Sequence, residues 1–185
     1  QIGVPHSCEP ADIDERIAEG EAPEDYVQRM ACEKARAVAQ RYQGIHCAIL
    51  AADTTVVIDG ETLGKPGNYD EALAMLQRLS GREHRVMTAI CVICGVSEAA
   101  ELVETVVEFV ELSRQQCEAY LATEEPWDKA GAYGIQGLAG AFVSGLQGSY
   151  SNVVGLPLAE TWQMLRAVGI QGELDTETTP DGAAV

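Results

Sequence analysis

Two long segments of alternating polar and apolar residues, His84 to Cys94 and Leu102 to Leu112, limit the fold more than any other feature of the chain. A period of two is typical of β-strands, and the short loop expected over 95–101 would join these segments as neighbouring strands. The helices expected elsewhere do not alternate regularly with strands, so a regular βαβ winding is not expected. The sequence therefore indicates a mixed α/β fold, in which a twisted sheet with hairpins is flanked by helices.

Cap and turn residues set the limits of the other expected elements. The signals are Pro23 followed by two acids, Asn68-x-x-Glu71, Ser113-x-x-Gln116 and the hairpin dipeptide Asp59-Gly60. Helices are expected over 23–43, 69–79, 113–122 and 158–168, strands over 45–52, 56–58 and 141–143, and a turn over 145–148. Residues 6–22 are expected to form a strand end and a loop, and the glycine-rich segment 131–140 is not expected to be regular helix.

The charge balance excludes several classes of partner. The chain has 29 acidic and 12 basic residues, which gives a net charge of −17. Proteins that bind nucleic acid or anionic lipid carry a basic surface, so neither partner is expected. No apolar run approaches the roughly 20 residues that a membrane helix needs, and no membrane association is expected.

The six cysteines are expected to be free thiols. A chain of 185 residues with 46% hydrophobic residues can bury a core without disulfides, and most of its cysteines lie in apolar runs. Cys91 and Cys94 match a C-x-x-C pattern, but residues three apart on a strand point to opposite faces. No second C-x-x-C or pair of histidines completes a zinc set. These thiols indicate a reducing compartment, so a cytoplasmic location is expected.

The chain contains only three lysines, Lys34, Lys65 and Lys129. Lys65 and Lys129 lie close to glycines in expected turns or loops. In an acidic protein, lysines held on rigid loops are candidates for binding an anion such as phosphate, and surface ion pairs are the alternative. A Walker phosphate loop is excluded, because the spacing between Gly60 and Lys65 is wrong and Pro66 replaces the required hydroxyl residue.

Asp53 is the strongest candidate for a catalytic carboxylate. It follows the apolar run Ile45 to Ala52, and α/β enzymes place catalytic and metal-binding acids at such strand ends; capping of a turn is the alternative. Glu15 could supply a second carboxylate to a magnesium site, although loop acids are commonly only solvated. The isolated histidines are assigned structural roles, since no nucleophile lies near them in a recognisable pattern. They are His6, His46 and His84.

Seven short motifs occur in the same order as in one protein family. They are Asp12-Ile-Asp-Glu15, Glu33-Lys34-Ala35, Ala52-Asp53-Thr54-Thr-Val-Val57, Leu63-Gly-Lys-Pro66, Leu79-Ser-Gly-Arg-Glu-His84, Asp128-Lys-Ala-Gly-Ala-Tyr-Gly-Ile-Gln-Gly137 and Gly148-Ser-Tyr-Ser-Asn-Val-Val-Gly-Leu-Pro157. On these motifs the chain resembles the Maf (multicopy-associated filamentation) proteins, which are nucleoside triphosphate pyrophosphatases. The resemblance extends to about Ile170 and implies a Maf/inosine-triphosphatase-like fold with two lobes around a central cleft.

The resemblance also implies the chemistry and the residues that perform it. Family members hydrolyse a nucleoside triphosphate between its α and β phosphates, release the monophosphate and pyrophosphate, and use a divalent cation, Mg²⁺ or Mn²⁺. Asp53 is the implied proton acceptor, and Asp53 and Glu15 are the implied metal ligands. Lys34 and Lys65 are implied to face the phosphates, and Lys129 is expected to bind substrate from its position on a loop. A homodimer is compatible with the resemblance.

Two residues, Thr54 and Gln136, match the branch of the family that prefers dTTP and UTP. The amide of Gln136 can pair with a carbonyl and the imide N–H of thymine or uracil. The branch that prefers 7-methyl-GTP carries a carboxylate at this position. A dTTP/UTP pyrophosphatase is the expected function, and the alternatives are a 7-methyl-GTP pyrophosphatase and a nucleotide-binding regulator of cell division without turnover.

The family motif Ser-x-Ser-Pro-Arg-Arg has no counterpart in the sequence, which begins at Gln1 with residues typical of a helix end. We expect that an amino-terminal strand and loop are missing and that activity depends on them. Residues 1–170 are expected to form a single Maf-like domain. Residues 171–185 are expected to form an acidic, disordered tail.

Overall fold

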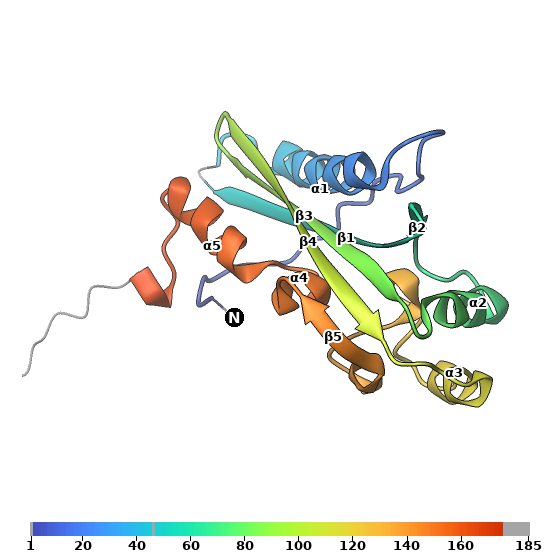
Figure 1. The fold of residues 1–185 in the computed structure, drawn as a ribbon. Coiled ribbons are helices and arrows are strands. Elements are labelled where there is room, and N and C mark those ends of the chain that lie inside the picture. The colour runs from blue at the N-terminus through green and yellow to red at the C-terminus, as the bar shows by residue number, and fades with distance from the viewer. Residues whose placement is uncertain (1, 46, 176–185) are drawn as a thin grey trace, which may run out of the picture.

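The computed structural model describes residues 2–45 and 47–175 and shows a five-stranded sheet in which neighbouring strands are antiparallel (Figure 1). The strand order is β2-β1-β3-β4-β5. The strands are β1 (Ala48–Ile58), β2 (Glu61–Leu63), β3 (Glu83–Cys94), β4 (Ser97–Phe109) and β5 (Val143–Gln147). The predicted α/β class, with a sheet built from hairpins and flanked by helices, is confirmed, whereas the division into two lobes stays a prediction.

The two long alternating segments form the neighbouring strands β3 and β4. The loop predicted over 95–101 is wrong, because only Gly95 and Val96 make the turn and pairing begins at Cys94 and Ser97. A two-residue turn preserves the ladder of backbone hydrogen bonds, so the strands continue to pair where the side chains of residues 97–101 are exposed. The result is a hairpin that projects beyond the core.

In the described part of the chain, five α-helices flank this sheet. They are α1 (Pro23–Ala39), α2 (Tyr69–Leu79), α3 (Arg114–Leu121), α4 (Tyr150–Val154) and α5 (Leu158–Ala167). The predicted caps are confirmed, since Asn68 accepts a hydrogen bond from the backbone N–H of Glu71 and Ser113 accepts one from that of Gln116. The helix predicted over 23–43 ends at Ala39 and continues as a 3₁₀ turn. The sequence did not predict α4, because five residues are too few to show a helical period.

The helices bury the two faces of the sheet in separate cores. On one face, which we call the α1 face, Val27 and Ala31 of α1 pack against Val57 and Met87 of the sheet. On the other, which we call the α4 face, residues of α2 and α3 pack around Val56, and α4 contacts β3 and β4. Figure 1 shows α1 on one side of the sheet and α4 on the other. Because side chains alternate along β1, Val56 and Val57 contribute to different cores.

The first strand differs from its prediction in a way that matters for the site. It begins at Ala48 rather than Ile45, which is exposed, and it runs without interruption through the expected turn at 53–55 to Ile58. Residues 48–54 are half-buried and only 55–58 are fully buried. Asp53 therefore lies inside a strand, paired with Ala89, and does not cap a turn.

Turn chemistry explains one confirmed element and one wrong one. Asp59 and Gly60 both have positive φ, 56° and 78°, as a two-residue hairpin turn between β1 and β2 requires. The strand predicted over 141–143 occurs instead over 143–147, and Gly145 lies within it rather than in a turn. Gly145 pairs with Glu108 at an irregularity of register, a place where glycine is common in strands.

The ends of the chain correct two further expectations. No strand occurs within residues 6–22, where only a turn at 19–20 is regular. The start of the predicted tail is ordered, because Asp175 accepts a hydrogen bond from the indole of Trp162 at 3.1 Å and pairs with Arg166 at 3.0 Å. The remainder of that prediction, residues 176–185, lies outside the described residues. Among the described helices, none has the length and apolarity needed to cross a membrane.

Candidate active site

Three charged residues from three parts of the chain meet beside the middle of β1. Lys34 of α1 places its Nζ atom 2.6 Å from Oδ1 of Asp53 and 2.7 Å from Oε1 of Glu15. Lys65, which follows β2, lies farther away, with Nζ 4.0 Å from Oε2 of Glu15. The sequence predicted Lys34, Asp53, Glu15 and Lys65 individually. The fold brings the first three into direct contact and places Lys65 beside them.

Burial changes the protonation of this cluster. The side chain of Asp53 is only 12% exposed, and burial raises its pKa above the ordinary value, although the hydrogen bond from Lys34 acts in the opposite direction. Burial also lowers the pKa of Lys34, but its bonds to Asp53 and Glu15 outweigh this and leave the pKa raised. The bond from Lys34 lowers the pKa of Glu15. Burial thus favours the protonated form of Asp53, whereas the bond from Lys34 favours the ionised form of Glu15.

A cavity of about 740 Å³ opens onto this cluster. Its wall contains all but one of the predicted site residues, namely Glu15, Asp53, Thr54, Lys65, Lys129 and Gln136. Lys34 is not part of this wall and lines an adjoining groove, which shares Glu15 and Ala52 with the cavity. Lys34 therefore contacts the carboxylates from behind, as seen from the cavity.

The cavity wraps around the edge of β1, so that adjacent residues reach it from opposite faces. Asp53 lies on the α1 face, next to Lys34, whereas Thr54 lies on the α4 face. The hydroxyl of Thr54 is 2.9 Å from that of Thr88, which donates to the backbone oxygen of Asn152 at 2.9 Å. Asn152 is fully buried and donates to Val86 O and Thr105 Oγ1. Thr54 is thereby held by a network of neutral groups.

The loop that carries Lys129 and Gln136 is fixed against β1 by one glycine. Gly131 has φ +68° and donates its N–H to Gly64 O at 3.1 Å, and a Cβ there would lie 3.0 Å from the side chain of Val56. Only glycine tolerates both conditions. The side chain of Gln136 is exposed at the mouth of the cavity. Lys129 pairs with Asp128 at 3.0 Å, so its ammonium is also held at the cavity.

Several residues of the site were not predicted. Tyr26 lines the cavity and donates its hydroxyl to Glu15 O at 3.0 Å, which ties the loop of Glu15 to α1. Glu125 lines it too and accepts from the N–H of Leu138 at 2.9 Å. Asn152 lay in a motif that supported the family resemblance, but a buried asparagine has no local signature in sequence.

The two described histidines, His6 and His84, differ in burial. His84 is buried on the α4 face, with Nε2 2.8 Å from the hydroxyl of Tyr133 and its ring edge-on to Phe109. Burial lowers its pKa to about 4, so the ring is neutral at pH 7. His6 is exposed, with Nδ1 2.9 Å from Val4 O, and His46 lies outside the described residues. Its burial and its hydrogen bond to Tyr133 are consistent with a structural role for His84, which stays a prediction.

Comparison with known proteins identifies close relatives. A family model described as Maf-like protein matches residues 1–168. Three similar proteins are each named dTTP/UTP pyrophosphatase. The protein of Symbiobacterium thermophilum is 49% identical, and the match covers 91% of this chain and 86% of the relative. The protein of Pseudoalteromonas atlantica is 51% identical, and the match covers 94% of this chain and 91% of the relative. That of Shewanella oneidensis is 52% identical over 86% and 82%.

Proposed function

Since this chain belongs to the Maf family, we propose that it is a hydrolase that converts dTTP and UTP to the monophosphate and pyrophosphate. Two relatives that are 49% and 51% identical to this chain over most of their length are named dTTP/UTP pyrophosphatase. The observation that carries the proposal is Asp53, a nearly buried carboxylate with a raised pKa on the wall of a cavity that also holds Lys65 and Lys129. A basic carboxylate beside fixed cations suits hydrolysis of a phosphoric anhydride.

Asp53 acts as the proton acceptor in this proposal. Water forms a bond to the α-phosphorus, the bond from that phosphorus to the α–β bridging oxygen breaks, and pyrophosphate leaves with the bonding electrons. The proton released from water passes to the carboxylate of Asp53, whose burial makes it a stronger base than an exposed aspartate. Lys34 holds Oδ1 of Asp53 at 2.6 Å and so orients the carboxylate towards the cavity.

The lysines stabilise negative charge on the polyphosphate. Lys65 is 61% exposed and lies 4.0 Å from Glu15, so it is free to turn towards a phosphate. Lys129 also lines the cavity and is held there by Asp128. Cations near the leaving group stabilise the charge that develops in the transition state. Lys34 adds a third positive charge near the cavity, where it pairs with Asp53 and Glu15.

The two carboxylates also suit a divalent cation, Mg²⁺ or Mn²⁺. Lys34 bonds to one oxygen of each carboxylate and leaves Asp53 Oδ2 and Glu15 Oε2 as hard oxygen donors. Mg²⁺ commonly binds through one or two carboxylates together with substrate phosphates, so the donor set fits. When bound, the cation neutralises charge on the phosphates and polarises the reacting phosphorus.

Thr54 and Gln136 select the base. Both line the cavity, and neither carries a charge. The amide of Gln136 has a donor and an acceptor, which match a carbonyl and the imide N–H of a pyrimidine. The neutral network behind Thr54 keeps its hydroxyl in one position. The proposal includes a cytoplasmic location, because the substrates belong to the soluble nucleotide pool. It also includes assembly as a homodimer.

The proposal is tested by hydrolysis of dTTP, UTP and 7-methyl-GTP in heavy-oxygen water. The assay uses the chain itself and the chain preceded by the family's Ser-x-Ser-Pro-Arg-Arg segment. We expect pyrophosphate as the product, with the heavy oxygen in the monophosphate, and faster turnover of dTTP and UTP than of 7-methyl-GTP. Heavy oxygen in pyrophosphate, or release of inorganic phosphate alone, would contradict attack at the α-phosphorus. Binding without turnover in both proteins would instead support a regulatory nucleotide-binding role.

A further inference from the structure

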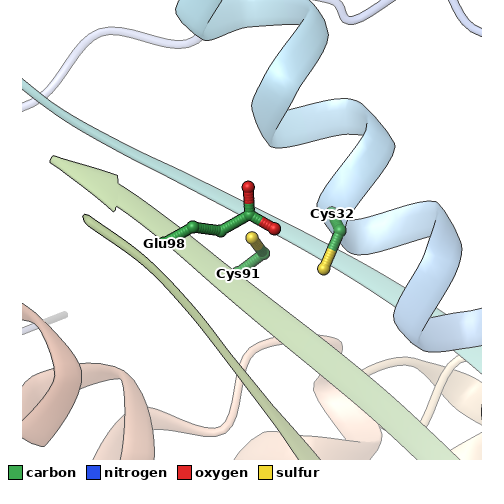
Figure 2. A group of neighbouring side chains, drawn as sticks. All are labelled: Cys32, Cys91 and Glu98. Atoms are coloured by element: carbon green, nitrogen blue, oxygen red, sulfur yellow. The ribbon is translucent and has the colours of Figure 1, made fainter. Parts of the chain in front are cut away.

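Two cysteines and a glutamate that are distant in sequence meet on the α1 face of the sheet. Cys32 comes from α1, Cys91 from β3 and Glu98 from β4, and Figure 2 shows their side chains converging. One ligand atom of each residue lies within 4.8 Å of the other two. None of the three lines the cavity around Asp53. The C-x-x-C pattern is not involved, because Cys94 lies outside the cluster.

We propose that Cys32, Cys91 and Glu98 form a binding site for a thiophilic divalent cation of the Zn²⁺ class. Two thiolates and a carboxylate are typical zinc ligands. A tetrahedral site with bonds of about 2.3 Å to sulfur places its ligand atoms roughly 4 Å apart, which is close to the spacing of these three. Sulfur ligands disfavour Mg²⁺, so this site and the carboxylates of Asp53 and Glu15 select different metals.

The surroundings of the cluster balance the charge of such a complex. Arg36, one turn after Cys32 on α1, pairs with Glu98 through both carboxylate oxygens, at 2.5 Å and 3.0 Å. Two thiolates, one carboxylate, a divalent cation and one guanidinium sum to zero charge. Neutrality lowers the cost of placing charges in a half-buried site. Arg36 also orients Glu98, as outer partners of metal ligands commonly do.

Access and coordination number favour metal binding over a purely structural role. Cys91 is fully buried, Cys32 is half-buried and the side chain of Glu98 is 35% exposed, so the cluster runs from the core to the surface. A cation can enter from the side of Glu98, and water can take the fourth position. Because the ligands come from a helix and from two strands of one hairpin, a bound cation links α1 to the sheet.

The test is Cd²⁺ binding by the full chain, kept reduced by a phosphine and in excess Mg²⁺. Cd²⁺ reports its ligands through the ultraviolet charge-transfer band of thiolates. We expect one Cd²⁺ per chain with this band, displaced by Zn²⁺ and insensitive to Mg²⁺. Loss of an outer partner alone typically weakens metal binding roughly 10- to 100-fold, so Cys32→Ser and Cys91→Ser should each weaken it by at least about 100-fold. Glu98→Gln should weaken it by at least about tenfold, and the control Cys94→Ser should not change it.

Three results would overturn the site. These are absence of the band in the reduced protein, a band that survives both Cys32→Ser and Cys91→Ser, or unchanged affinity in Glu98→Gln. If Cys91→Ser does not fold, Cys32→Ser on the half-buried side of α1 decides the question. A reduced protein that takes up no Cd²⁺ but forms a Cys32–Cys91 disulfide with an added thiol oxidant would identify a redox pair instead.

Discussion

Adjacent residues of β1, Asp53 and Thr54, contribute to one cavity from opposite faces of the sheet and in opposite ways. On the α1 face, Asp53 belongs to a chain of charges that continues through Lys34 to Glu15. On the α4 face, Thr54 belongs to a neutral network that continues through Thr88 to Asn152. Under the proposed function, the phosphate chemistry and the selection of the base would depend on separate sets of side chains.

The two faces also differ in how function relates to stability. A buried carboxylate is costly even when it is paired, and the raised pKa of Asp53 records that cost. The neutral network satisfies both donors of the buried Asn152 amide, although its Oδ1 accepts no hydrogen bond from the described residues. Its hydrogen bonds contribute to stability. Substitutions on the α1 face should therefore change the rate more than the stability, whereas substitutions on the α4 face should change stability and base preference.

The largest expected effect is that of Asp53→Asn on the α1 face. Removal of the proton acceptor should lower kcat for dTTP at least about 100-fold. The free energy of unfolding should change by less than about 1 kcal/mol, because loss of the Lys34 bond is offset by removal of a buried charge. Asp59→Asn, the same change at the turn that ends β1, is the control and should keep kcat within about threefold. A variant that retains a tenth of the activity would remove Asp53 from this role.

On the α4 face, the next effect is a loss of stability in acid through His84. Its pKa is about 4 when folded and about 6.5 when unfolded, so the unfolded state binds more protons between these values. The contribution of the neutral ring is fully present above pH 6.5 and is lost as the pH falls towards 4, by about 3 kcal/mol in total. Denaturant unfolding at several pH values measures it. His84→Phe should lack this component of the slope, and an identical slope in both proteins would contradict the assignment.

Lys65→Ala tests whether the sparse lysines act on phosphate. Loss of a cation that faces developing charge should lower kcat/KM about 100-fold. Arg166→Ala is the control, since Arg166 is 55% exposed and its contacts within the described part of the chain are with Asp175 and the ring of Trp162. It should change kcat/KM by no more than about threefold. Equal losses in the two variants would show that lost charge in general, rather than the position of Lys65, affects turnover.

Asn152→Ala is expected to have the smallest of these effects on catalysis and a clear effect on stability. It removes two buried hydrogen bonds and leaves Thr105 Oγ1 and Val86 O without that donor, which typically costs about 2 kcal/mol. Chemical denaturation measures this loss, and kcat for dTTP should fall by less than about tenfold. If the free energy of unfolding falls by less than about 0.5 kcal/mol, the neutral network does not stabilise the fold as proposed.

The parts of this fold that sequence predicts are those with a strong local signal. The pairing of β3 with β4, the caps at Asn68 and Ser113, and the Asp59-Gly60 turn are confirmed, although β4 runs from Ser97 to Phe109 rather than from Leu102 to Leu112. Where pairing with the adjacent strand sets the end of a strand, the sequence carries no local signal for that end. β1 runs through Asp53 because β3 continues to pair with it there, and β4 extends into solvent because a tight turn keeps the ladder intact.

The site is predictable in its residue types and not in its connections. The rarity of lysine and the family motifs pointed to Lys34, Asp53 and Glu15, but the carboxylate–ammonium–carboxylate chain depends on how α1 packs on β1. The same packing brings Cys32 to Cys91, 59 residues apart, whereas the C-x-x-C pattern drew attention to Cys94. Contacts between distant elements follow from tertiary packing, which one sequence does not encode in any local pattern.

The separation of phosphate chemistry from base selection is tested most directly by kcat/KM for dTTP, UTP and 7-methyl-GTP in Asp53→Asn and Gln136→Glu. Asp53→Asn should lower all three values by the same factor, because the α1 face acts on the phosphates that the substrates share. Gln136→Glu loses the amide donor and adds a charge, so dTTP and UTP should fall by roughly tenfold or more relative to the cationic 7-methyl-GTP. The deciding quantity is the ratio of kcat/KM for dTTP or UTP to kcat/KM for 7-methyl-GTP. If Gln136→Glu leaves this ratio unchanged, or if Asp53→Asn alters it, the separation of phosphate chemistry from base selection is contradicted.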